Sequence, residues 1–217
     1  MLPSDLLNLF RLEMADKAAP YLWTNDFVIG AIDDAQKQFA RLTDGIPDST
    51  TSAVVNLVVT TPYTDVLPLS TRILKIRSAR RADTGKAVEV LNLEDMPTRG
   101  MFFDNVPGTL RALIVGMDDG FVRLWPFPAA ALTIKLSVFR LPLADITDDE
   151  PLEIPTQHHR HLLLWVKHLA YSVHDAETFD KTKAAEFKTA FEAYCFGAKT
   201  DQTRARHKPR TVTYGGI

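Results

Sequence analysis

Residues 153–199 decide the fold; they read EIPTQHHRHLLLWVKHLAYSVHDAETFDKTKAAEFKTAFEAYCFGAK. Pro155 suits the first position of a helix, where a backbone N–H would lack a partner. The helix that follows has an apolar stripe at spacings of three and four, formed by Leu162, Trp165, Val166, Leu169, Ala170 and Val173. After a break at 175–178, a second stripe predicts a helix that ends close to Gly197, with Ala184, Phe187, Phe191, Tyr194, Cys195 and Ala198 on its apolar face. Two helices joined by a short link are typical of an antiparallel pair, whose apolar faces need partners elsewhere in the chain.

Two helices near the N-terminus would supply those partners. Ser4 is a suitable N-cap for a first helix, which ends before Pro20. The cluster Thr24-Asn25-Asp26 caps a second helix, which ends at Asp44-Gly45. We expect the apolar face of this second helix to comprise Val28, Ala31, Ile32, Ala35, Phe39 and Leu42, and its polar face to comprise Asp33, Gln36, Lys37 and Arg41.

The middle of the chain changes from a helical period to a period of two. Short apolar or alternating stretches bounded by turn residues predict strands at residues 53–59, 72–79, 87–91, 110–115, 121–125 and 132–139. Asp83-Thr84-Gly85 and Asp118-Asp119-Gly120 predict hairpins, and Pro107-Gly108 predicts a further turn. In the last strand alternate residues are apolar and are expected to be buried against Val54, Val58 or Ile114; these alternate residues are Leu132, Ile134, Leu136 and Val138.

Strands in one block between helices predict an α+β fold and no Rossmann-type phosphate crevice. We expect a helical bundle built from both chain ends, with an inserted antiparallel β domain and an extended C-terminal tail. The expected segments are N-terminal helices at 1–47, the β domain at 48–143, an acidic linker at 144–152, C-terminal helices at 153–199 and the tail at 200–217.

Composition excludes few classes of protein. The chain has 217 residues, is 46% hydrophobic and carries a net charge of -2, so neither nucleic acid nor a membrane surface is an obvious partner for the whole chain. No apolar run approaches the roughly 18 residues that a membrane-spanning helix needs. The single cysteine, Cys195, excludes an intramolecular disulfide and lies on a helical stripe, where free cysteines are commonly buried and inert.

No motif of catalysis, cofactor binding or metal binding is evident. Five histidines gather in one stretch, but the i, i+4 pair with an acid between that makes a helical zinc site is missing, which favours helix-surface or interface histidines; they are His158, His159, His161, His168 and His174. The sequence has no Gly-x-Ser-x-Gly elbow, Walker loop or Gly-x-Gly-x-x-Gly. The adjacent carboxylates Asp33-Asp34 and Asp148-Asp149 are interpreted as solvated charges. We therefore expect no enzyme activity, cofactor or metal.

Two basic stretches offer an alternative in the DNA-binding class. The first, at 72–86, contains one acid, Asp83, and six basic residues: Arg72, Lys75, Arg77, Arg80, Arg81 and Lys86. The second is the tail, which carries Arg204, Arg206, Lys208 and Arg210 against Asp201. Neither stretch has the interleaved aromatics that stack on single strands. The competing interpretation is a solvated strand face for the first stretch and a disordered tail for the second. For the tail we favour contacts with protein.

Three stretches together resemble head–tail adaptor (connector) proteins of tailed bacteriophages. The first runs from Leu22-Trp23-Thr24-Asn25-Asp26 through Ala31-Ile32-Asp33-Asp34-Ala35 to Leu42-Thr43-Asp44-Gly45-Ile46. The second is Leu124-Trp125-Pro126-Phe127-Pro128, followed by the alternating strand. The third runs from Glu153-Ile154-Pro155-Thr156-Gln157-His158-His159 through Leu169-Ala170-Tyr171 to a helix that starts at 180–183. The resemblance covers most of residues 20–200.

This resemblance implies a structural protein without catalysis. It implies a small helical bundle with a β insertion and a homo-oligomeric ring, usually of twelve copies, between the portal and the tail of the virion. Such a ring seals the DNA exit channel and provides the attachment site for tail or nozzle proteins. Genomic DNA passes through its lumen without sequence-specific binding, and the protein assembles in the host cytoplasm.

The shared motifs do not cover the C-terminal tail, whose role we infer from its residues. It has few apolar groups to offset the cost of ordering the backbone, and Thr211-Val212-Thr213-Tyr214 alternates as a strand does. We hypothesise that the tail extends onto the portal or an adjacent subunit, by adding a strand to a sheet edge. The expected partner-binding residues are Arg204, Arg206, Lys208, Arg210, Val212, Tyr214 and Ile217.

Two other classes of function remain open from sequence. One is an α+β enzyme or ligand-binding protein with an unrecognised site, and the other is a DNA-binding protein that uses the basic stretch at 72–86. A large ring is expected only of the adaptor, so the mass of the assembled protein separates it from both. Salt-sensitive duplex binding would favour the DNA-binding class.

Overall fold

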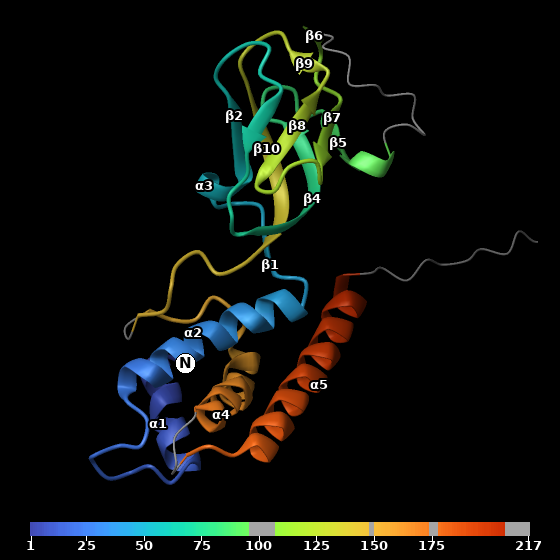
Figure 1. Cartoon of the computed structure of the whole chain (residues 1–217). Coiled ribbons are helices and arrows are strands. Elements are labelled where there is room, and N and C mark those ends of the chain that lie inside the picture. Colours follow the sequence, from blue (N-terminus) through green and yellow to red (C-terminus); the bar gives the residue numbers. More distant parts are fainter. Residues whose placement is uncertain (96–106, 148–149, 174–177, 207–217) are drawn as a thin grey trace, which may run out of the picture. The chain divides into compact units, whose positions relative to one another are not determined.

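The computed structural model confirms an α+β fold and describes residues 1–95, 107–147, 150–173 and 178–206 (Figure 1). The chain forms two compact units. The helical unit joins Met1–Asp44 with Ala144–Ile217, and the β unit comprises Gly45–Leu143.

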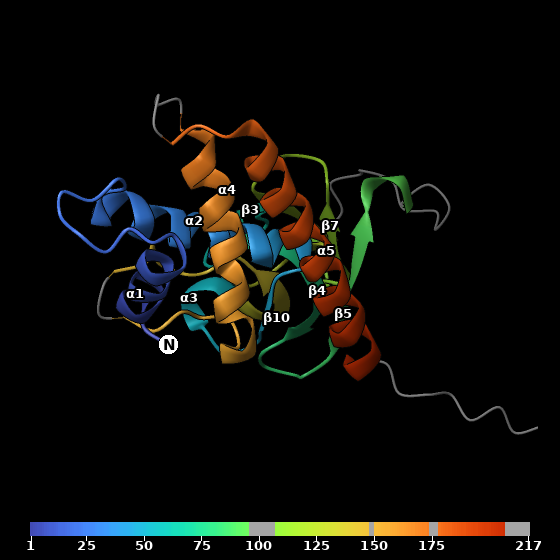
Figure 2. The same ribbon diagram turned by 90° about the horizontal axis from the view of Figure 1, so that it is seen from below.

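The helical unit is built around α4, with α1 and α5 on either side (Figure 2). α4 packs against α1, α2 and α5, and α2 also contacts α1 and α5. The helices are α1 (Pro3–Glu13), α2 (Asn25–Leu42), the 3-10 helix η3 (Thr156–His161), α4 (Leu162–Ser172) and α5 (Lys181–Arg206). Apolar stripes from both ends of the chain meet in its interior, where the largest fully buried side chains are Leu6, Phe10, Ile32, Phe39, Leu162, Leu163 and Phe191.

The helix boundaries differ from the sequence-based prediction at three points. Helix α1 begins one residue before Ser4, with Pro3 in its first turn, because proline is already fixed in a helical φ. Pro155 precedes a 3-10 turn and not the α-helix itself. Helix α5 continues through Gly197 to Arg206, so the first residues of the expected tail are helical.

Trp165 is partly exposed, but its ring packs on the buried Phe191 with centroids 5.2 Å apart, and its Nε1–H donates to Asp34 Oδ2 at 2.6 Å. Two other side chains in the helical unit differ from expectation. Gln36 is buried and accepts a hydrogen bond from the Glu153 backbone N–H at 2.8 Å, whereas Leu42 is exposed. The hydrogen bond explains why a polar side chain is stable in that interior.

The β unit is a curled mixed sheet with a small second sheet (Figure 1). The main sheet has the order β1-β10-β4-β5-β7-β8-β3, and β2 pairs with β10 beside β1. Its strands are β1 (Ile46–Asp48), β2 (Asn56–Val59), β3 (Val66–Pro68), β4 (Ile73–Arg81), β5 (Ala87–Asn92), β7 (Ala112–Val115), β8 (Phe121–Trp125) and β10 (Leu132–Arg140). The other elements are α3 (Ser52–Val55), η1 (Leu93–Asp95) and the paired short strands β6 (Pro107–Gly108) and β9 (Phe127–Pro128).

Local signals in the β region predicted local pairing well. Both hairpins are present, as β4–β5 and β7–β8. Ile134, Leu136 and Val138 of β10 are buried in one cluster with Val54. Ile114 is buried as well, but Val58 is 54% exposed, because it lies on the outward side of β2.

Three features of the β unit correct the prediction. Strand β5 pairs with β7 in parallel, as does β6 with β9, so the sheet is mixed and not wholly antiparallel. The chain between Asn92 and Ala112 is long enough for the crossover that a parallel pair requires. Residues 53–59 begin in the short helix α3 before they enter β2, and Pro107-Gly108 forms β6 instead of a turn.

A buried ion pair joins the ends of β1 and β10 in the β unit. Arg140 Nε donates to Asp48 Oδ2 at 2.6 Å, and both side chains are nearly inaccessible to solvent. Burial disfavours the carboxylate, but hydrogen bonds from Thr51, Thr50 and Arg140 outweigh it and hold the pKa of Asp48 well below its usual range. Gly45 lies beside this pair at φ +88°, and a Cβ there would lie 3.1 Å from backbone atoms of Arg140, so glycine is required at this position.

Candidate interaction surfaces

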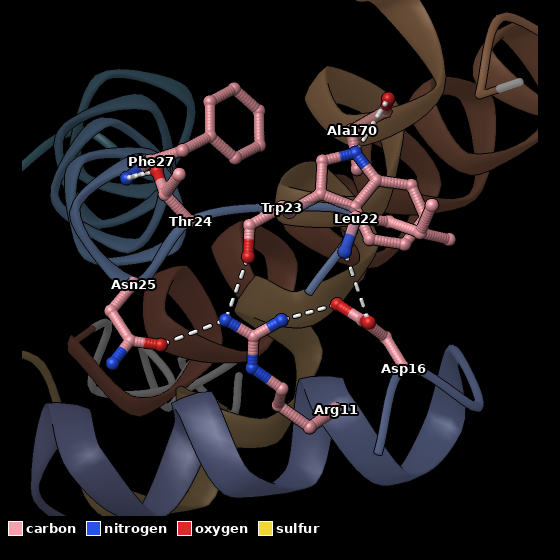
Figure 3. A network of polar contacts seen from close by, with 8 residues as sticks. All are labelled: Arg11, Asp16, Leu22, Trp23, Thr24, Asn25, Phe27 and Ala170. Atoms are coloured by element: carbon pink, nitrogen blue, oxygen red, sulfur yellow. Dashed lines mark hydrogen bonds and ion pairs between the residues drawn. The ribbon is translucent and has the colours of Figure 1, made fainter. Parts of the chain in front are cut away.

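A buried polar network fixes the loop between α1 and α2 (Figure 3). Arg11 lies on the last turns of α1 and pairs with the carboxylate of Asp16. Its second terminal nitrogen donates to the backbone oxygen of Trp23 and to Asn25 Oδ1, both at 2.7 Å. Asp16 accepts a further hydrogen bond from the Leu22 N–H at 3.1 Å. The planar guanidinium thus ties two segments of the loop to one helix.

This network presents an apolar surface at the outer side of α1. Trp23 is buried, and its Nε1–H donates to the Ala170 oxygen at 3.2 Å, which anchors the loop on α4. Its neighbours Tyr21 and Leu22 are 44% and 53% exposed. Tyr21 covers the Arg11 guanidinium at 3.8 Å from its ring centroid, beside a hollow of about 430 Å³. Neighbouring exposed apolar side chains on a loop that is held by buried hydrogen bonds form a candidate interaction site.

A second candidate surface is the outer face of α5. Asp180 caps this helix through the backbone N–H groups of Thr182 and Lys183, at 3.1 and 3.0 Å. Phe191 and Cys195 lie on its buried face, whereas Phe196 is 74% exposed. A shallow hollow of about 740 Å³ follows the outer face, lined by Lys181, Thr182, Ala185, Glu186, Thr189, Ala190 and Ala193. Three of these seven residues are alanines, and two, Lys181 and Glu186, carry long polar side chains.

The structure describes two of the partner-binding residues predicted from sequence, Arg204 and Arg206. Arg204 and Arg206 lie in the last turns of α5 and are exposed. Arg204 is 3.7 Å from Asp201, and Arg206 donates to Gln202 at 3.0 Å. The remaining predicted residues, Lys208, Arg210, Val212, Tyr214 and Ile217, lie outside the described residues.

The basic stretch at 72–86 follows β4 and the hairpin after it. Lys75, Arg77 and Arg80 are exposed on the strand, and Arg77 lies over the Phe139 ring at 5.1 Å. Arg81 is paired with Asp83, with Nε to Oδ1 at 3.0 Å. The stretch therefore forms an exposed strand face on which some basic side chains, such as Arg81, already have partners within the chain.

The structure places His158 and His159 in the interior of the helical unit, and not on a helix surface. His159 Nε2 lies 2.8 Å from the Ile154 oxygen, and His158 Nδ1 lies 2.8 Å from the Tyr194 hydroxyl. Burial lowers the pKa of both rings, so both are neutral near pH 7. Over the ranges that the structure describes, no group of three or more histidine, cysteine or acidic side chains could hold a metal ion.

The remaining reactive candidates are structural. Cys195 is buried, and that burial raises the pKa of its thiol to about 12, which keeps it protonated and unreactive. Asp33 is not simply solvated, since it pairs with Lys37 and accepts a hydrogen bond from the Ile146 N–H at 3.1 Å. Asp148-Asp149 lies outside the described residues.

Sequence reasoning missed Arg11 and Asp16. The motif Leu22-Trp23-Thr24-Asn25-Asp26 pointed to this loop, but Arg11 lies on a short helix where no pattern separates a buried arginine from a surface one. The sequence did not indicate the outer face of α5 as an interaction surface, because its exposed residues do not repeat as an apolar stripe.

A comparison with protein families matches residues 1–213 to the family described as SU10 adaptor protein. In a search of curated proteins, none matches the chain. No helix in the described part of the chain is long and apolar enough to cross a membrane.

Proposed function

The chain belongs to the SU10 adaptor protein family, and from that membership we propose that it is the head–tail adaptor of a phage virion. The family indicates a structural phage adaptor protein, a component of the virion. The match over residues 1–213 is the single observation that carries the proposal, because it includes both units of the fold. In the proposed role the protein forms a homo-oligomeric ring, usually of twelve copies, at the junction of head and tail.

In this role the protein would act without catalysis. One side of the ring contacts the portal, the other receives tail or nozzle proteins, and the ring seals the DNA exit channel. Genomic DNA passes through the lumen and is not read by sequence. Assembly takes place in the host cytoplasm.

The two exposed apolar surfaces of the helical unit support a protein that acts through contacts with other chains. Phe196 lies on α5, whereas Tyr21 and Leu22 lie in the loop between α1 and α2. A closed ring needs two different surfaces on each subunit, one for each neighbour. We propose that the outer face of α5 forms one of them.

We further propose that the C-terminal residues carry the contact onward to the portal or to a neighbouring copy. Arg204 and Arg206 end α5 in solvent. Their charge suits an acidic partner surface, such as the segment that contains Asp145 in a neighbouring copy.

The proposal is tested by adding the purified protein to portal-bearing, DNA-filled heads that lack it. Wild-type protein should bind to saturation at a fixed number of copies per head, about twelve in the proposed ring, because a closed ring has a fixed number of subunits. Phe196→Asp should bind less, whereas Val58→Asp, which also replaces an exposed apolar side chain, is the control. Absence of any binding to these heads would overturn the adaptor proposal. Equal binding of Phe196→Asp and wild type would remove only the role of α5.

A further inference from the structure

A short segment, here called the strap, is held on the helical unit close to two buried histidines. The strap, Leu152, Glu153, Ile154 and Pro155, leads directly into η3, which carries His158 and His159. Leu152 and Ile154 are buried, and the Glu153 N–H donates to Gln36 of α2. The third fixed point of the strap is the Ile154 carbonyl, which is 2.8 Å from the His159 ring.

His159 has no place for a second proton. A carbonyl oxygen only accepts, so the Ile154 oxygen assigns the ring's one proton to Nε2. The other nitrogen, Nδ1, is buried and has no hydrogen-bond partner among the described residues. Because His159 is 2% exposed, a proton on Nδ1 would put a charge in the interior without an acceptor.

His158 likewise has no acceptor for a second proton. Its Nε2 lies 3.2 Å from the Gln157 amide nitrogen, which donates, so Nδ1 carries the proton and donates to the Tyr194 hydroxyl. A second proton on Nε2 would therefore face a donor. The ring also packs on Phe39, with centroids 4.8 Å apart, so protonation would charge the contact between η3, α2 and α5.

The charged and titratable groups around these rings do not favour an added positive charge. Burial, and then His161 and His159, lower the pKa of His158. Burial also lowers the pKa of His159, as does the N-terminal amine; the hydrogen bond to the Ile154 oxygen raises that pKa but does not outweigh burial. From α5 the facing group is Tyr194, stacked on His161 with centroids 3.7 Å apart. The neighbouring charges are Glu153 on the strap, which is exposed, and Arg160, which is paired with Glu13 at 3.2 Å.

We propose that His158 and His159 form an acid-sensitive latch, which holds the strap on the helical unit while both rings are neutral and releases it when they are protonated. Burial lowers the pKa of both rings from an ordinary 6.5, which agrees with this geometry. In the released state both rings reach water and regain their ordinary affinity for protons. The latch therefore weakens as the pH falls below about 6.5 and is fully closed above it.

Two substitutions, combined in one variant, retain the hydrogen bonds of the two rings but remove their titratable nitrogens. Gln places its amide nitrogen where His Nε2 lies, and Asn does so for Nδ1, so the test variant is His158→Asn with His159→Gln. The control is His168→Asn, because His168 uses Nδ1 to contact the Ala184 oxygen at 3.0 Å and lies outside the latch. Hydrogen exchange of the full chain, read by mass spectrometry and corrected for intrinsic rates, gives the opening equilibrium of peptides from the strap and from α4.

In the wild type, opening of the strap peptide should rise by up to about tenfold per pH unit for each histidine between pH 6.5 and 5. The rise should precede any change in α4, should persist in His168→Asn and should be nearly absent in the double variant. Chemical shifts of the ring protons provide a second readout, with both latch histidines titrating below an ordinary histidine. Equal pH dependence in wild type and double variant would overturn the latch, as would loss of protection in α4 together with the strap.

Discussion

Buried charged side chains in this protein are held by several hydrogen bonds each. Arg11 contacts Asp16, Trp23 and Asn25, and Asp48 accepts from Arg140 and from the backbone of Thr50. A charge removed from water is tolerated only when its hydrogen-bonding capacity is used in this way. Loss of one partner should therefore cost more than the pair contributes, because it leaves the other charge alone in the interior.

Asp48→Asn should strongly destabilise the β unit, because Arg140 would then be buried without a counter-charge. We expect a loss of about 3–5 kcal/mol. The slowest-exchanging amides of β10 measure it, since that strand is paired on both sides, with β4 on one and with β1 and β2 on the other. Asp83→Asn is the matched control, because the Asp83 side chain also pairs with an arginine but is 52% exposed, and it should change little. Equal effects of the two variants would contradict the account of the buried pair.

The same pair predicts how the β unit responds to acid. The pKa of Asp48 is lowered in the folded protein, so the unfolded chain binds more protons than the folded one below an ordinary value near 3.8. The contribution of Asp48 to stability is thus present above that pH and is lost as the pH falls further. In Asp48→Asn this part of the acid dependence should disappear.

Arg11→Lys should loosen the loop before α2 although it keeps the charge. An ammonium group cannot reproduce the fork that contacts Asp16, Trp23 and Asn25 together, and we expect a cost of about 1–3 kcal/mol. The amide of Leu22, which donates to Asp16, should exchange faster. Arg41→Lys, on the exposed side of α2, is the control. An unchanged Leu22 amide would show that the network does not hold the loop.

At the scale of elements, local patterns predicted what local forces decide. Apolar stripes and caps placed α2, α4 and the start of α5, and turn residues placed both hairpins. Patterns of burial could not follow α5 past Lys199, because its last turns are polar on all sides and are extended by i, i+4 contacts such as Arg206 with Gln202. The parallel pairing of β5 with β7 joins two strands that are distant in the sequence, and no short motif in either strand predicts it.

The candidate surfaces were harder to predict than the fold. Exposed residues such as Phe196 have no periodic neighbours, and the role of Arg11 depends on a loop that folds back over it. The expectation of helix-surface or interface histidines does not describe His158 and His159, which lie in the interior of the helical unit. His158 has a partner at each ring nitrogen, and His159 has a partner at Nε2 but none at Nδ1 among the described residues. Spacing along the chain does not reveal such partners.

Gly197→Ala separates the stability of α5 from its proposed contact. A Cβ at Gly197 would meet no atom within 4 Å, so alanine should stabilise the helix, by roughly 0.5–1 kcal/mol. If a neighbouring copy packs closely on this face, the same variant should bind heads less well. Gly30→Ala is the control, since Gly30 lies in α2 with equally open surroundings. Stabilisation in both variants with undiminished binding of Gly197→Ala would exclude a close contact at that residue.

On the scale of the whole molecule, membership of the SU10 adaptor protein family covers both units. The family indicates a structural role in a phage particle. Three features of the chain agree with a protein that acts by binding other chains: a rigid apolar loop at α1, an exposed face of α5 and basic residues at its end. The position at the head–tail junction is the central proposal.

Electron microscopy of particles from a phage that lacks this protein tests that proposal most directly. In the proposed role the protein acts after the head is filled, so deletion should produce DNA-filled heads without tails, and supply of the wild-type protein in trans should restore tailed, infectious particles. Normal tailed and infectious particles from the deletion phage would contradict the account.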